Sequence, residues 1–102
     1  MTTANKLLNQ FVGQDLADTT PPSAIYTLSP STTIAPPGPV VITVIAYDDI
    51  SGVNSITTPD GKINQVSTVT YSVTVNGTYT FLLTDNAGNT ASFSVTVTNI
   101  HL

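Results

Sequence analysis

Several residue types are missing from this chain of 102 residues, and each absence excludes a class of protein. The sequence has no cysteine, which excludes a disulfide framework, a thiolate nucleophile and a zinc–cysteine site. It has no arginine and only two lysines, and its formal net charge is −4. Without a basic patch the chain is not expected to bind nucleic acid or an anionic membrane surface. No hydrophobic run approaches the length of a membrane span.

Glutamate is also missing, so all six acidic residues are aspartates. Aspartate is favoured in turns and caps, whereas glutamate is favoured inside helices. Charged residues make up 8% of the chain and hydrophobic residues 40%, so its polarity comes from Thr, Ser and Asn. This composition predicts one folded domain made of strands that are joined by acidic turns.

The first 22 residues differ from the rest of the chain. Residues 1–22 are interpreted as a lead-in segment that ends in a Pro-rich linker, Asp18-Thr-Thr-Pro-Pro22. Residues 23–100 are expected to form the folded domain. The lead-in has no apolar core suited to a signal peptide. Met1 is therefore expected to be an engineered start on a fragment, or else the protein leaves the cell by another route.

From Ser23 onward, short runs alternate between apolar and polar residues, with turn residues between them. Six or seven such runs at this spacing predict a β-sandwich or barrel. The expected strands are residues 24–28, 40–47, 53–58, 62–66, 67–75, 78–84 and 90–99. In the fifth run, Val69, Tyr71, Val73 and Val75 are expected to face inward.

The second run has two apolar faces. Val40, Ile42, Val44 and Ala46 form one face, while Val41, Thr43, Ile45 and Tyr47 form the other. The second face is too apolar for an ordinary solvated sheet. We expect the lead-in segment or a neighbouring domain to cover it. The alternative is an exposed patch around Tyr47 that stacks on sugar rings. Tyr26 is a further candidate for such stacking, whereas Tyr71 is expected to lie in the core.

Four motifs occur in an order that points to a family. They are Asp48-Asp-Ile-Ser-Gly-Val53, Thr58-Pro-Asp-Gly61, Asn76-Gly-Thr-Tyr-Thr-Phe81 and Asp85-Asn-Ala-Gly-Asn89. Together they resemble bacterial immunoglobulin-like (Big-type) repeat domains of cell-surface or secreted proteins, over about residues 20 to 100. Phe81 takes the place of the second core cysteine of immunoglobulin domains, and the usual tryptophan is absent.

The resemblance implies an all-β, immunoglobulin-like β-sandwich of about seven antiparallel strands with Greek-key connections. It also implies an extracellular, non-catalytic spacer module, monomeric and next to similar domains, that supports adhesion. One alternative is a binding module of a secreted hydrolase, with a glycan or a host or cell-wall protein as its partner. Another alternative is a decoration domain on a phage structural protein.

The resemblance also changes the interpretation of Asn76-Gly77. On local grounds this pair favours a tight type I′ hairpin. In an immunoglobulin-like sandwich it would lie instead where the chain crosses between the two sheets. The Tyr79 hydroxyl would then bond a backbone group a few residues upstream, as in a tyrosine corner.

Catalysis is not expected. His101 is the only histidine and is the penultimate residue, whereas a general base needs a fixed partner within a pocket. Asp48 and Asp49 are adjacent in one turn and cannot face each other across a substrate.

Calcium is the expected cofactor if the chain binds one, because Ca²⁺ takes carboxylate, amide and carbonyl oxygens. The candidate ligands are Asp48, Asp49, Asp85 and Asn86, with Asn89 able to supply a further amide oxygen. They belong to two loops at the same end of an immunoglobulin-like sandwich. Asp18 is expected at the opposite pole. The alternative is that these residues only stabilise their own turns.

Overall fold

The computed structural model describes residues 17–102, and every regular element in this range is a β-strand. None of these residues belongs to a helix that could cross a membrane. The strands are β1 (Ser23–Ser29), β2 (Val40–Tyr47), β3 (Val53–Thr57), β4 (Ile63–Asn64), β5 (Thr68–Val73), β6 (Gly77–Asp85) and β7 (Thr90–Val97). The strand expected over residues 62–66 is shorter in the structure. A turn closes before it at Gly61, and after it the Val66 amide donates back to the Asn64 carbonyl oxygen, so only Ile63 and Asn64 pair with β3.

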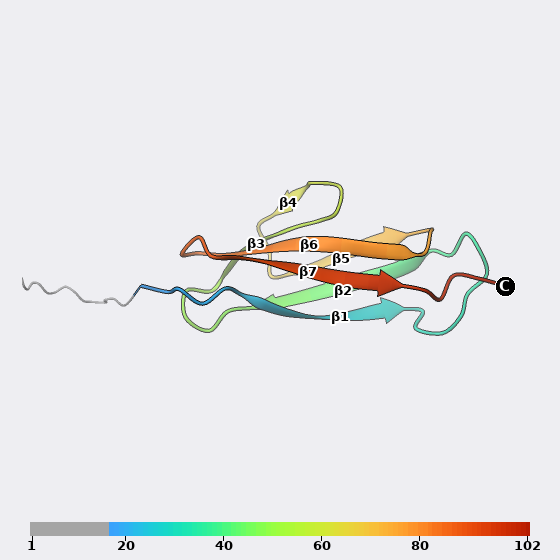
Figure 1. The fold of residues 1–102 in the computed structure, drawn as a ribbon, viewed down its shortest axis with the longest axis horizontal. Helices are drawn as coiled ribbons and strands as arrows, with labels where there is room; N and C mark the ends of the chain where they lie inside the picture. Colours follow the sequence, from blue (N-terminus) through green and yellow to red (C-terminus); the bar gives the residue numbers. More distant parts are fainter. Residues whose placement is uncertain (1–16) are drawn as a thin grey trace, which may run out of the picture.

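The strands form two antiparallel sheets, one with the order β1-β2-β5 and the other with the order β4-β3-β6-β7. The described chain enters at one end of the sandwich and leaves at the other (Figure 1). We call these ends the N-terminal pole and the C-terminal pole. An all-β sandwich of seven antiparallel strands is therefore confirmed.

The core lies between the two sheets and follows the two-residue alternation of the sequence. In β2 the expected inner face is buried and the outer face is half-buried or exposed. Phe81 on β6 is fully buried and packs edge-on against Tyr71 of the other sheet. The other fully buried apolar side chains among the described residues are Val40, Ile42, Val44, Ile56, Leu83, Val95 and Val97.

The segment between β5 and β6 is a crossing and not a hairpin. β5 pairs with β2, whereas β6 pairs with β3 and β7 in the other sheet. The Tyr79 hydroxyl donates to the carbonyl oxygen of Val75, which confirms the tyrosine corner. The expectation for Val75 was wrong: its side chain is 65% exposed, because β5 ends at Val73 before the chain turns toward the second sheet.

The crossing also holds the end of the chain. The Asn76 side chain donates to the Ile100 carbonyl oxygen at 2.9 Å and accepts from the Ile100 amide at 3.0 Å. Ile34 forms a parallel bridge with the buried Ile100. These contacts close the C-terminal pole, and sequence periodicity did not indicate them.

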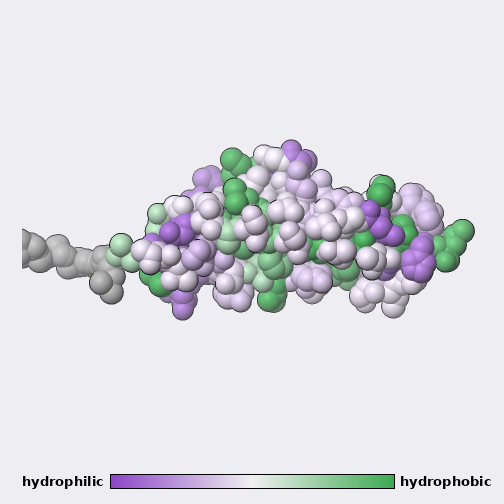
Figure 2. All heavy atoms as spheres, in the orientation of Figure 1, coloured by the Kyte–Doolittle hydropathy of each residue, from purple (hydrophilic) through white to green (hydrophobic). Residues whose placement is uncertain are grey.

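The outer face of the β1-β2-β5 sheet carries apolar side chains. Tyr47 and Ile25 are each 55% exposed and Ile45 is 37% exposed. Ile25 and Ile45 lie opposite each other on β1 and β2. The expected cover from the lead-in rests mainly on residues 1–16, which lie outside the described residues. On the side that Figure 2 shows, hydrophobic residues form separate spots among weakly polar ones.

Candidate functional site

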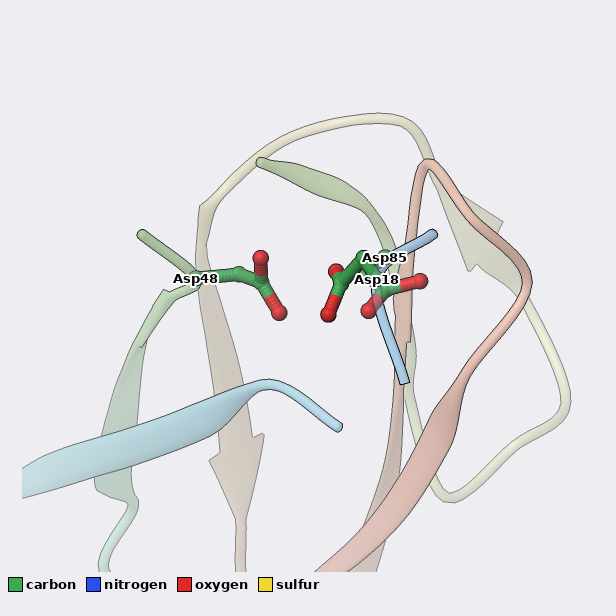
Figure 3. A group of neighbouring side chains, drawn as sticks. All are labelled: Asp18, Asp48 and Asp85. Atoms are coloured by element: carbon green, nitrogen blue, oxygen red, sulfur yellow. The ribbon is translucent and has the colours of Figure 1, made fainter. Parts of the chain in front are cut away.

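Three aspartates meet at the N-terminal pole, and we call them the Asp triad. They are Asp18, Asp48 and Asp85, each of which offers a carboxylate oxygen within 4.8 Å of the other two. Figure 3 shows Asp48 pointing toward Asp18 and Asp85 from the other side of the pole. Asp85 is 1% exposed and Asp18 is 8% exposed, so two of the three carboxylates are buried.

The strand directions bring the triad together. Asp48 follows the last residue of β2, and Asp85 is the last residue of β6. The expectation that Asp18 lies at the opposite pole was wrong. Because β1 runs antiparallel to β2, Ser23 at the start of β1 pairs with Tyr47 at the end of β2. The segment before β1 therefore reaches the same pole as Asp48.

Asp48 organises the loop after β2 through one oxygen. Its Oδ1 accepts from the backbone amides of Ile50, Ser51 and Gly52 at 3.2, 3.0 and 3.2 Å. The Ser51 hydroxyl donates in turn to Asp18 Oδ2 at 2.6 Å. Asp18 Oδ1 accepts from the Thr20 amide at 2.9 Å. The loop and the segment before β1 are thus joined by a side-chain contact.

Asp85 organises the β6–β7 hairpin in the same way. Its Oδ1 accepts from the amides of Ala87 and Asn89, and its Oδ2 accepts from the Asn89 side chain at 2.9 Å. Burial alone would raise the pKa of the Asp85 carboxyl. The hydrogen bonds that Asp85 accepts from Asn89 outweigh it and, with smaller contributions from the Asp18 side chain and the Ala87 amide, hold the pKa of Asp85 below its usual value. Asp85 is therefore a carboxylate at neutral pH.

The other two residues expected as ligands, Asp49 and Asn86, are not part of the triad. Asp49 is exposed. The Asn86 amide nitrogen donates to the Ser51 carbonyl oxygen at 2.8 Å, and its oxygen accepts from Asn54 at 3.1 Å. Asn86 therefore joins the two loops as a structural residue. Asn89 joins the hairpin to the segment before β1, since its amide also donates to the Asp18 carbonyl oxygen at 2.8 Å.

The donor set of the triad suits a hard cation. All the available groups are carboxylate oxygens, which Ca²⁺ prefers over nitrogen or sulfur ligands. The three bonds to Asp48 all end on Oδ1, and a carboxylate has about four lone-pair positions in total. If calcium binds, Asp18, Asp48 and Asp85 are the residues that would hold it. The same network of amide donors also explains the turns without a metal.

The tyrosines differ in how much of each ring is available. Tyr47 is 55% exposed on the outer face. Tyr26 is 46% exposed, but its ring packs edge-on against Phe93 at a centroid distance of 6.0 Å. Tyr71 packs against Tyr79 and Phe81, as the core assignment predicted. The outer face thus presents a single free aromatic ring, Tyr47, among its described residues.

Comparisons with known proteins add one structural likeness. No family model matches the sequence, and no curated protein matches it. The chain is similar to a solved structure concerned with the promiscuous specificity of carbohydrate-binding modules from the β-sandwich superfamily. The TM-score is 0.58 and the sequence identity is 26% over 82% of this chain. The match spans 36% of the length of the solved chain.

Proposed function

We propose that this chain is a non-catalytic β-sandwich module that binds carbohydrate and is part of a larger extracellular protein. The observation that carries the proposal is the structural match, which includes most of the described residues at 26% identity. The surface chemistry agrees with it. With 8% charged residues and many Thr, Ser and Asn side chains, the module offers hydroxyl and amide groups, which suit the neutral hydroxyls of sugars.

Retention on polysaccharides tests this function. In native affinity gels that contain xylan, mannan, β-glucan or starch, we expect at least one polysaccharide to slow the protein. A non-binding globular protein of similar size should keep its mobility in all the gels. If the module migrates equally in every gel and is not retained by insoluble cellulose or chitin, the carbohydrate proposal is wrong.

A second role, as a spacer that supports adhesion, is compatible with the first. It is supported by the positions of the two poles, because the chain enters the sandwich at one end and leaves at the other (Figure 1). Neighbouring domains attached at the two poles would therefore be arranged end to end. Small-angle scattering of two copies joined by residues 1–22 should give an elongated particle. A particle of compact, side-by-side shape would contradict the spacer role.

We also propose that the Asp triad binds calcium and so stiffens the N-terminal pole. Asp18 comes from the linker segment, whereas Asp48 and Asp85 come from two loops of the sandwich. One cation between them would couple the linker to the domain. Binding to the folded state alone adds about 2.7 kcal/mol of stability when free calcium is 100 times its dissociation constant.

Thermal unfolding in millimolar CaCl₂ and in EDTA tests the calcium site. We expect the melting temperature to be several degrees higher in calcium, and Asp18→Ala and Asp48→Ala to abolish this difference. Asp49→Ala is the matched control, because Asp49 is adjacent to Asp48 but lies outside the triad. Equal melting temperatures of the wild-type protein in calcium and EDTA would remove the site.

A further inference from the structure

A groove of about 420 Å³ lies between the edges of the two sheets, away from the Asp triad. One wall is the segment around β4, with Thr58, Asp60, Lys62 and Asn64. The other wall is β5, with Thr68, Thr70 and Tyr71. β4 and β5 are the edge strands of their sheets, so this groove runs along an open side of the sandwich. Its volume falls within the range of ordinary small-molecule sites.

The lining of the groove has the chemistry of a neutral polar ligand site. It contains one carboxylate from Asp60 and one ammonium group from Lys62, so its formal charges cancel. An amide and several hydroxyls complete the polar surface, while Tyr71, Val66 and Val69 add aromatic and aliphatic surface. A polyanion would need more basic groups than one lysine supplies. Hydroxyl-rich, uncharged molecules match this set of donors and acceptors.

Two polar side chains on the β4 side, Asp60 and Asn64, are oriented by hydrogen bonds within that segment. The Asp60 carboxylate accepts from the Thr58 hydroxyl and from the Lys62 amide. The Thr58 bond is the main cause that keeps the pKa of Asp60 below its usual value. The Asn64 amide nitrogen donates to the carbonyl oxygens of Ile56 and Lys62 at 3.3 and 3.1 Å, and neither bond uses the side-chain oxygen.

The aromatic side of the groove is supported by the core. The Tyr71 ring lies 6.0 Å from Phe81 and 6.2 Å from Tyr79 between ring centroids. Phe81 is fully buried, so the ring that lines the groove is supported by the core. An aromatic surface that is already fixed loses little conformational freedom on binding, which favours affinity.

We propose that the groove between β4 and β5 binds a neutral sugar unit, with Asp60, Lys62 and Asn64 bonding its hydroxyls and Tyr71 contacting its ring. This inference rests on the proposed carbohydrate-binding function and assigns a binding site to it. It also predicts that the exposed Tyr47 on the outer face of the other sheet is not the binding site.

Amide chemical shifts of the full chain test the groove, with cellotetraose, xylotetraose, mannotetraose and chitotetraose as probes. We expect a tetrasaccharide that binds to shift the amides of residues 58–71. Asp60→Ala and Lys62→Ala should each weaken binding about tenfold, as expected for loss of a hydrogen bond to a charged group. Both residues are exposed, so the variants should remain folded. Tyr47→Ala and Asp49→Ala are the controls and should bind like the wild type.

The other outcomes separate the groove from the proposed function. If a tetrasaccharide binds but shifts the amides around Tyr47, or if the Asp60 and Lys62 variants bind like the wild type, the groove is the wrong site although the module binds carbohydrate. If no tetrasaccharide causes a shift and no polysaccharide retains the protein, both the proposed function and the groove site are wrong.

Discussion

Tyr79 connects β6 to the crossing that precedes it through its hydroxyl. Its ring packs beside Tyr71, while the hydroxyl donates to the carbonyl oxygen of Val75 at the crossing between β5 and β6. The bond fixes the direction in which the chain enters β6. Because the bond is made with a backbone carbonyl, it constrains the crossing whatever side chain occupies position 75.

Replacing Tyr79 by phenylalanine should therefore lower the free energy of unfolding by about 0.5–1.5 kcal/mol, the usual net value of one hydrogen bond. Urea unfolding followed by circular dichroism measures the change. Tyr47→Phe serves as the control, since Tyr47 is exposed on the outer face and surface substitutions usually change stability by less than about 0.5 kcal/mol. Equal losses in the two variants would contradict the role of the corner.

Asp85 makes stability depend on pH in a defined direction. Its pKa is lower in the folded protein than the usual value of 3.8, so the unfolded chain takes up the proton first as the pH falls. The contribution of the carboxylate is complete above the unfolded pKa and is lost as the pH falls through the folded pKa. In EDTA, Asp85→Asn should be less stable than the wild type at about pH 7, and the difference should shrink at about pH 3. Urea midpoints that differ equally at both pH values would contradict this.

The sequence identified two members of the Asp triad but not the third. Asp48 and Asp85 follow strands whose inward faces are clear from alternation, so their loops could be assigned to one pole. Asp18 precedes β1, and its position depends on the direction in which that edge strand pairs with β2. Asp49 and Asn86 were expected as ligands because of their residue types and their place in these two loops, which cannot show where a side chain points within a turn.

The strands differ in how firmly they are held. β6 lies between β3 and β7 and pairs with β7 over eight residues, whereas β4 pairs with β3 at only two positions. Apolar burial follows the same order, since Phe81 and Leu83 on β6 are buried and Ile63 on β4 is 68% exposed. The wall of the groove that β4 forms is therefore the less stable wall.

Native-state hydrogen exchange should reflect this difference. We expect the amides of β6 that bond within the sheet to exchange slowest, close to the rate set by global unfolding. The amides of Ile63 and Asn64 should exchange much faster through local opening. Mass spectrometry of pepsin fragments that separate residues 58–66 from residues 77–85 measures both rates. Equal protection of the two segments would contradict the expected order.

The sequence was sufficient to predict most strands, because apolar and polar residues alternate with a period of two where one face of a strand is buried. β2, β3, β6 and β7 lie within about two residues of the expected ranges. The range expected for β5 extended through Val75, although the strand ends at Val73. An apolar residue at a crossing continues the alternation without continuing the strand. The tie between Asn76 and Ile100 joins residues 24 positions apart, and no local pattern records such a contact.

At the scale of the whole molecule, the two proposed sites lie on different parts of the sandwich. The Asp triad is at the N-terminal pole, whereas the groove follows the open side between β4 and β5. Composition predicted no partner that needs a basic surface, but it did not indicate the groove. The groove depends on which strands become the sheet edges, and β4 was expected as a longer strand with no assigned neighbour.

A glycan microarray probed with the labelled chain tests carbohydrate binding, on which both the proposed function and the groove site depend. We expect a signal above background on neutral glycans and a signal no higher than background on sulfated or sialylated glycans, because Lys62 is the only lysine among the described residues. A uniform background over every glycan class, from protein that is folded by circular dichroism, would contradict carbohydrate binding.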